Sequence, residues 1–423
     1  MTPPQVLMAR LVVAVAFSAA TLALVSSRKL EKLPEATFDR LVRTAFVVSR
    51  VGLFVLLFLV LRLPPRGDIN IYVEQARAVL DGRLPYRDFV SAYAPLYPYL
   101  NAGLLLLSKT GLAIMFMAIV CECATVWLWL GSGRKFFTDR EVRLGALLYL
   151  GSALSVQYIS VDGQNNSLAG LTVAAAVVVL ARYRSALSGF LLGVGISVVK
   201  FLPLIYAPLF FMTSPRRWLW VGGLVLCCVP VYGWFVLHHA PILVPVMSEG
   251  SLRTSGNLPY VIEMVFGVGL PDRLYDGTVA VALLAIFGLV FRVTVGSTHE
   301  VRMRALSFGM AAVIVAAVLF SKKSWPPYLI LALFPICLTV PAKRTCVLLF
   351  ALFNVASCLE PSAWWLASSA QGVEMHRHLV ARVPAAMGFL PLDLLMVAAY
   401  SWLLMLAVRG ILGRSAEAGE PVV

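Results

Sequence analysis

Long apolar runs are the feature that most limits what this chain can fold into. A stretch of roughly 20 apolar residues is long enough to cross the hydrocarbon core of a bilayer. Clear examples are residues 6–26, 44–63, 111–131, 218–237, 278–295 and 384–408. The sequence is 60% hydrophobic and 13% charged, whereas a soluble domain has about 25% charged residues. We therefore predict a polytopic membrane protein.

Charged residues, prolines and glycines divide the apolar sequence into about 12–13 membrane segments. The predicted segments are residues 6–26, 44–63, 111–131, 143–158, 166–181, 186–199, 203–213, 218–238, 278–295, 305–320, 327–341, 344–358 and 384–408. Segments 186–199 and 203–213 are too short to cross alone and could form one broken pair. We predict an all-α transmembrane bundle that forms a single domain over residues 1–410, followed by a disordered cytoplasmic tail at 411–423.

Basic residues gather in alternate short loops, of which 27–43 and 132–143 are the richest. Because lysine and arginine favour short cytoplasmic loops, we expect the amino terminus outside and the carboxyl terminus in the cytoplasm. The long loops 64–110, 239–277 and 359–383 then face outward, and we expect the chemistry there. Topology accounts for the net charge of +14, so no nucleic-acid partner is expected.

The loop after the second apolar run carries a carboxylate at the expected membrane boundary. Asp68 stands there, and such a residue is a functional hypothesis by default. Residues 69–80 predict a helix that ends at Gly82, and residues 96–107 predict a short interfacial helix. Asp68 could instead cap the first of these helices.

Several motifs follow one another in an order that is typical of one enzyme class. They are Gly67-Asp68, Tyr72-x3-Ala76, Gly82-x2-Pro85-Tyr86-x-Asp88-Phe89, Tyr93-x-Pro95-Leu96, Asp162-Gly163-Gln164-Asn165-Asn166, Lys200-Phe201-Leu202-Pro203 and Ser321-Lys322-Lys323-Ser324-Trp325-Pro326-Pro327-Tyr328. In this order they resemble the GT-C glycosyltransferases, and within them the bacterial polyprenol-phosphate-mannose-dependent mannosyltransferases. The resemblance runs from about residue 60 to residue 340.

This resemblance implies a GT-C type bundle in a bacterial plasma membrane, with catalytic outer loops and an extracytoplasmic active site. The reaction it implies moves a sugar, most commonly mannose, from a polyprenyl-phosphate donor to a hydroxyl of a glycolipid or glycan, with inversion. Asp68 would act as the general base. The donor is the co-substrate, and neither a cofactor nor a metal is expected, since no carboxylate cluster resembles a metal cage.

The expected reaction also needs cations and hydrogen-bonding side chains, because charge builds up on the leaving phosphate. Candidate phosphate-binding residues are Lys200, Lys322, Lys323, Arg253 and Arg87. Candidate sugar-binding or acceptor-binding residues are Tyr72, Tyr86, Asp88, Tyr93, Gln164, Asn165 and Tyr328. Other interpretations stay open: Lys322 and Lys323 could be interfacial anchors, Lys200 could pair with a buried carboxylate, and residues 164–165 could be an ordinary turn.

Three further functional hypotheses remain beside mannosyl transfer. The same reaction could use another sugar, such as arabinofuranose. A lipid or sugar transporter is favoured by the break at Lys200-Phe201-Leu202-Pro203, although the two halves of the sequence show no repeat. The chain could also be a non-catalytic subunit of an envelope assembly. Gly189-x3-Gly193 indicates close helix packing rather than chemistry.

Overall fold

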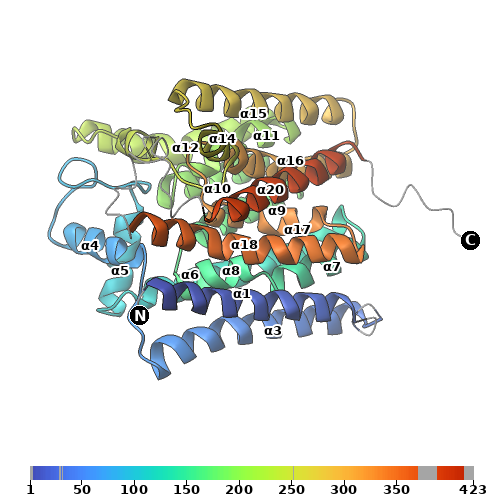
Figure 1. Ribbon diagram of the computed structural model, residues 1–423. Helices are drawn as coiled ribbons and strands as arrows, with labels where there is room; N and C mark the ends of the chain where they lie inside the picture. The colour runs from blue at the N-terminus through green and yellow to red at the C-terminus, as the bar shows by residue number, and fades with distance from the viewer. Residues whose placement is uncertain (1–2, 28–29, 31, 251, 370–387, 414–423) are drawn as a thin grey trace, which may run out of the picture. The chain divides into compact units, whose positions relative to one another are not determined.

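The computed structural model describes residues 3–27, 30, 32–250, 252–369 and 388–413 (Figure 1). Within these residues the regular elements are all helices, and the one extended pairing is an isolated bridge between Pro85 and Phe89. The prediction of an all-α chain is therefore confirmed.

Eight helical stretches of the described chain are long and apolar enough to cross a membrane, or nine if a bent pair counts as one span. The eight are Gln5–Val25, Glu35–Val60, Leu112–Lys135, Arg217–Leu237, Asp272–Thr294, His299–Phe320, Arg344–Ala363 and Leu390–Ile411. The bent pair is Asp139–Leu150 with Ala153–Val161, and the shorter apolar helices are Asn166–Leu180, Ser185–Val198, Leu202–Thr213 and Pro326–Thr339. The chain is thus an integral, multi-pass membrane protein.

The predicted segments match these helices one by one, but the estimate of 12–13 segments overstated how many could cross alone. Several boundaries were also wrong: the helices expected to begin at residues 278 and 305 begin at Asp272 and His299, and two errors were larger. The helix expected to begin at residue 44 begins at Glu35, since charged residues occupy its first turns. The helix expected to end at 358 continues to Ser369, so the first part of the expected loop 359–383 is helical. Residues 370–387 and 414–423, which include most of the predicted tail, lie outside the described residues.

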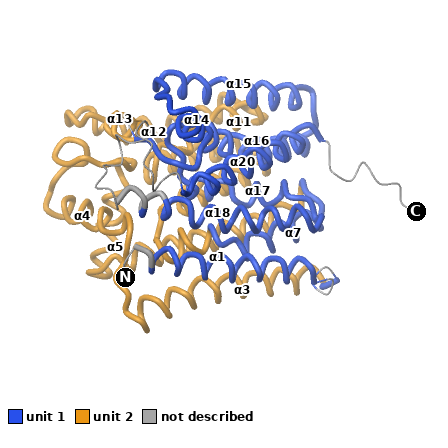
Figure 2. Tube along the Cα trace, in the orientation of Figure 1, with its two compact units in different colours: residues 1–33, 136–154, 251–423 blue, residues 34–135, 155–250 orange. Residues whose placement is uncertain are grey.

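The chain divides into two compact units, each built from separate stretches of sequence (Figure 2). Unit 1 comprises residues 1–33, 136–154 and 251–423, and unit 2 comprises residues 34–135 and 155–250. The prediction of one domain stays a prediction, and each unit is described by itself below.

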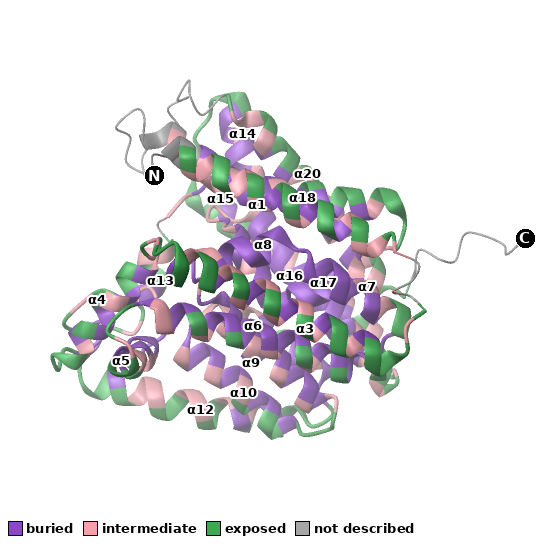
Figure 3. Ribbon diagram, turned by 90° about the horizontal axis from the view of Figure 1, so that it is seen from below, coloured by how far each residue is buried: buried purple, intermediate pink, exposed green. Residues whose placement is uncertain are grey.

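Unit 1 is built mainly from long apolar helices, with several short ones between them. Its helices are α1 (Pro3–Val25), α7 (Asp139–Leu150), α14 (Leu258–Phe266), α15 (Asp272–Thr294), α16 (His299–Phe320), η5 (Pro326–Ala332), α17 (Leu333–Thr339), α18 (Arg344–Ser369) and α20 (Leu390–Ile411), with the short α8 (Ala153–Ser155) at the boundary. Helix α1 packs along α18, and α16 packs against both α15 and α20 (Figure 1). Helix α16 is the most enclosed of the candidate spans, with 83% of its apolar window buried (Figure 3).

Unit 2 holds the remaining helices and both helical parts of the loop 64–110. They are α3 (Glu35–Phe54), η1 (Val55–Val60), α4 (Ile69–Leu80), α5 (Tyr97–Leu107), α6 (Leu112–Ser132), η2 (Gly133–Lys135), η3 (Val156–Val161), α9 (Asn166–Leu180), α10 (Ser185–Val198), η4 (Leu202–Tyr206), α11 (Ala207–Thr213), α12 (Arg217–Leu237) and α13 (Val244–Gly250). The helix expected at 69–80 and the short helix expected near 96–107 are both present.

Glycine allows α10 and α12 to approach closely. A Cβ atom added at Gly189 would lie 2.0 Å from the Trp220 carbonyl oxygen, and one added at Gly223 would lie 1.9 Å from the Ala186 carbonyl oxygen. Backbone contact of this kind is possible only where a side chain is missing. The interpretation of Gly189-x3-Gly193 as a packing motif is therefore confirmed.

A buried ion pair lies inside the apolar helices of unit 2. The side chains of Arg50 in α3 and Glu122 in α6 are both fully buried, with 3.7 Å between Arg50 Nε and a Glu122 carboxylate oxygen. Arg50 Nη2 donates to Ser155 Oγ at 2.8 Å, and Ser155 donates in turn to Glu122. The guanidinium also stacks over Phe46, 4.2 Å from the ring centroid. This cluster ties α3 and α6 to the residue that precedes η3.

We expect Glu122→Ala to lower the stability of the protein, because it leaves the Arg50 guanidinium buried without its counter-charge. Breaking a buried pair in this way costs about 3–5 kcal/mol, so thermal unfolding in detergent should begin at a clearly lower temperature. The matched control is the double variant Arg50→Met with Glu122→Leu, which removes both charges and should lose less stability. A single variant as stable as the wild type would contradict this account.

Candidate active site

The Asp68 carboxylate is half-buried and stands at the beginning of α4. Asp68 occupies the N-cap position, but its side chain makes no hydrogen bond to the helix backbone. The carboxylate instead accepts a hydrogen bond from Gln164 Nε2 at 3.1 Å. The alternative that Asp68 is a helix cap is therefore wrong, and its carboxylate is partly open to another molecule.

A tight turn after η3 brings Gln164 to this carboxylate. The Gln164 backbone N–H closes the turn on the Tyr158 carbonyl at 2.8 Å. Gly163 has a φ of +62°, and a Cβ atom there would lie 2.7 Å from both Ile69 Cδ1 and Met115 Cγ. Only glycine satisfies both the left-handed backbone and the contact with the first residue of α4. The Asp-Gly-Gln sequence thus fixes a long-range contact as well as a turn.

Lys200 stands at the break between α10 and η4, close to the same carboxylate. The extended loop before α5 is hydrogen-bonded to the end of α10. The Ala94 N–H donates to the Val199 carbonyl and the Leu96 N–H donates to the Ser197 carbonyl, each at 3.2 Å. Lys200 Nζ lies 5.5 Å from the centroid of the Tyr93 ring. Burial lowers the pKa of Lys200 to about 8, and the nearby Asp68 carboxylate acts in the opposite direction.

Three tyrosines form an aromatic cluster beside Asp68. The Tyr72 ring lies 5.0 Å from that of Tyr93 and 5.1 Å from that of Tyr97, both edge-on, and the last two rings are 5.3 Å apart. Burial raises the pKa of Tyr72 well above its usual value, with smaller contributions from Tyr93, Tyr97 and Asp68. The Tyr72 phenol therefore stays neutral and able to donate a hydrogen bond.

Tyr97 and Asn101 belong to this cluster but were missed in the sequence. They lie four residues apart on α5 and so share one face of the helix. In the described chain, the hydroxyls of Tyr72 and Tyr97 and the amides of Asn101 and Asn165 are buried close to one another, but none of them makes a hydrogen bond of good geometry. Such a group costs about 1–3 kcal/mol when unsatisfied, so this region is suited to a hydroxyl-bearing ligand or to water. The Tyr-x3-Asn spacing was the available signal.

Three other candidates lie in the same loop but are engaged locally. The Arg87 guanidinium donates two hydrogen bonds of 2.9 Å to the Asp88 carboxylate, which also accepts a hydrogen bond from the Leu84 N–H at 2.7 Å. The Arg87 hydrogen bonds and the Leu84 N–H lower the pKa of Asp88 to about 2. The Tyr86 hydroxyl donates to the Tyr93 carbonyl, while its ring packs near Phe235. These contacts hold the loop in shape.

The remaining candidates, Arg253, Lys322, Lys323 and Tyr328, lie in unit 1, whereas Asp68, Gln164 and Lys200 lie in unit 2.

Two of the unit 1 cations are paired with carboxylates. Arg253 contacts Glu263 at 3.0 Å and Asp272 at 2.5 Å. Lys322 lies 3.3 Å from both Asp272 and Asp276. A phosphate that bound to Arg253 or Lys322 would have to compete with these carboxylates. The roles of both residues, and those of Lys323 and Tyr328, stay predictions.

A buried carboxyl pair in unit 1 was also missed. Glu360 and Asp393 are each 3% exposed, and the two carboxyl groups lie close enough to influence one another electrostatically. Ser255 donates to Glu360, which fastens the loop before α14 to α18. A carboxylate within a predicted apolar segment, or next to its end, was the signal that could have identified them.

In the described part of the chain, no three histidine, cysteine, aspartate or glutamate side chains are grouped so as to hold a metal ion.

The chain was compared with protein families, with curated sequences and with solved structures, and a similarity is found only among the solved structures. No protein-family model matches the chain. No curated protein sequence matches it either. A solved structure similar to the chain is the crystal structure of ArnT from Cupriavidus metallidurans bound to undecaprenyl phosphate, with a TM-score of 0.45 and 13% identity over 87% of this chain and 78% of that one. A likeness this distant carries no conclusion about activity.

We expect Gly163→Ala to destabilise unit 2, because alanine must adopt a left-handed backbone and also displace Ile69 or Met115. The backbone cost alone is about 1–2 kcal/mol, and overpacking adds about 1–3 kcal/mol. The matched control is Gly82→Ala, where φ is +80° but no atom lies within 4 Å of an added Cβ. Thermal unfolding should separate the two variants, and equal losses would show that the close approach is unimportant.

Proposed function

We propose that this chain is a GT-C type membrane glycosyltransferase that transfers a sugar from a polyprenyl-phosphate donor to an acceptor hydroxyl. The observation that supports this most is the meeting of three separated motifs in unit 2. Gln164 donates to Asp68, and Lys200 stands close enough for the Asp68 charge to act on it. A carboxylate, an amide donor and a cation in one place are the groups that this reaction requires.

In the proposed reaction, the acceptor hydroxyl attacks the anomeric carbon of the donor and gives its proton to Asp68. The bond between the anomeric carbon and the phosphate oxygen breaks, and the polyprenyl phosphate leaves with the bonding electrons. The hydrogen bond from Gln164 occupies one Asp68 oxygen and leaves the other to accept the proton. The Lys200 ammonium stabilises the negative charge that builds on the phosphate.

The finer features of the proposal rest on the resemblance of the motifs. They are mannose as the sugar, a glycolipid or glycan as the acceptor, inversion at the anomeric carbon and an active site on the outer face of a bacterial plasma membrane. Arabinofuranose is the alternative sugar. Tyr72, Tyr93 and Asn165 are the proposed sugar-binding or acceptor-binding residues. The Asp68 charge acts on Tyr72, the Tyr93 ring lies 5.0 Å from that of Tyr72, and Asn165 follows Gln164 in the chain.

A transporter is the second candidate, and one observation favours it. Lys200 lies between two short apolar helices, α10 and η4, and broken helices of this kind form transport sites in several membrane protein folds. Movement of labelled lipid across vesicles, without transfer of the sugar, would favour this alternative.

We expect Asp68→Asn to abolish transfer, because asparagine keeps the shape and the contact with Gln164 but cannot take a proton. Loss of a general base typically reduces the rate by about 10²–10⁴-fold. The measurement is transfer of radiolabel from polyprenyl-phosphate-mannose, or from its arabinofuranose counterpart, to a membrane lipid extract by the purified protein. The control is Asp81→Asn, an exposed carboxylate at the other end of α4. Equal transfer by wild type and Asp68→Asn would remove Asp68 as the base.

We expect donor binding to weaken as the pH rises through about 8. The pKa of Lys200 is lowered to about 8, so the ammonium is present below that pH and is lost above it. Lys200→Arg keeps its charge at every pH used, and its donor affinity should stay flat between about pH 7 and pH 9.5. The measurement is the dissociation constant of the donor at several pH values. A wild-type constant that does not change with pH would exclude Lys200 as the phosphate ligand.

A further inference from the structure

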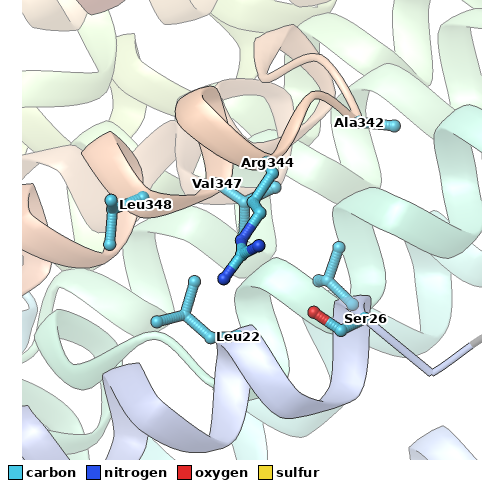
Figure 4. Close-up of a pocket in the computed structure, with 7 residues that line it drawn as sticks. Leu22, Ser26, Ala342, Arg344, Val347 and Leu348 are labelled. Carbon is cyan, nitrogen blue, oxygen red and sulfur yellow. The ribbon is translucent and has the colours of Figure 1, made fainter.

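A cavity in unit 1 is lined by none of the candidate residues considered above. It has a volume of about 290 Å³ and lies between the end of α1 and the beginning of α18 (Figure 4). Leu22, Val25 and Ser26 line one side, and Arg344, Val347 and Leu348 line the other. Its wall is mostly aliphatic, with one hydroxyl and one guanidinium as its polar side-chain groups.

The guanidinium of Arg344 extends between α18 and the end of α1, toward Leu22 (Figure 4). Some arginines of unit 1 are paired with carboxylates: Arg143 contacts Asp139 at 2.5 Å, and Arg304 contacts Glu141 at 2.8 Å. Arg344 has no ion pair with any carboxylate in the described part of the chain. Its planar fork of donors is therefore available to an anion that comes from outside the protein.

The position of the cavity restricts what that anion can be. Both helices that form it are candidate membrane spans, and the cavity lies at the end of each. Leu348 and Leu352 follow one another at a spacing of one helical turn on α18 and are 46% and 45% exposed. An aliphatic strip thus leads from the cavity along the apolar helix, toward the hydrocarbon. An occupant with an anionic head and an apolar tail matches both parts.

We propose that this cavity binds an anionic phospholipid, with its phosphate on Arg344 and an acyl chain along Leu348 and Leu352. Guanidinium groups bind phosphate oxygens through two parallel hydrogen bonds. The Ser26 hydroxyl can donate a further one, while Leu22 and Val347 contact the glycerol and upper acyl carbons. Basic pockets between membrane helices bind anionic head groups in this manner. The site is independent of the proposed transfer reaction.

The test uses the purified full-length protein in detergent, titrated with phosphatidylglycerol or with phosphatidylcholine of the same acyl chains. Bound lipid is counted by native mass spectrometry. Phosphatidylglycerol should bind the wild type more tightly than phosphatidylcholine, whose head group has no net charge. Arg344→Gln should weaken phosphatidylglycerol binding by about tenfold, the effect of losing a hydrogen bond to a charged group.

The matched control is Lys343→Gln, which removes the neighbouring exposed cation that does not line the cavity. It should leave phosphatidylglycerol binding within about twofold of the wild type. An equal loss in both variants would mean that diffuse surface charge attracts the lipid, and the proposal would fail. It would also fail if both lipids bound the wild type equally well. Because mass spectrometry counts bound lipid, neither result depends on whether the protein transfers a sugar.

Discussion

Hydrocarbon offers no hydrogen-bond partner to a peptide group, and this constraint governs the structure of the whole chain. Each backbone N–H and C=O within the bilayer must be satisfied inside its own segment, which leaves helices as the solution for such runs. The described residues follow this rule, since their regular elements are helical. The same constraint explains why the polar chemistry lies where helices end or break. Asp68 begins α4, Gln164 follows η3, and Lys200 separates α10 from η4.

Charges that do lie within the apolar helices are joined to other polar groups. Arg50 and Glu122 form a pair, with Ser155 bonded to both. Glu360 has a second carboxyl group and the Ser255 hydroxyl as neighbours. A buried charge is expensive unless a partner offsets it, so each of these clusters constrains which helices can pack together. The Arg50 cluster therefore joins α3, which precedes Asp68 in the chain, to the start of η3, which precedes Gln164.

Polar groups near Asp68 differ from these clusters, in which each charged side chain makes at least one hydrogen bond. The hydroxyls of Tyr72 and Tyr97 and the amides of Asn101 and Asn165 are buried in the described chain without a hydrogen bond of good geometry. A stable fold does not accumulate such groups without reason. Their position beside a half-buried carboxylate, which is a poor arrangement for stability alone, is what an enzyme or binding protein needs in order to hold a polar ligand.

The sequence by itself determined the helices and the position of the catalytic candidate. Apolar runs and breakers located the membrane segments, and the helix at 69–80 was placed to the residue, because these features depend on local composition and on hydrogen bonds within one segment. Tertiary structure decided the rest. Gln164 meets Asp68 across 96 residues of sequence, and Arg50 meets Ser155 across 105. The closeness of Glu360 to Asp393 and the cavity at Arg344 also depend on which helices pack together. No local pattern encodes such contacts, because they follow from side-chain fit between helices that are distant in the sequence.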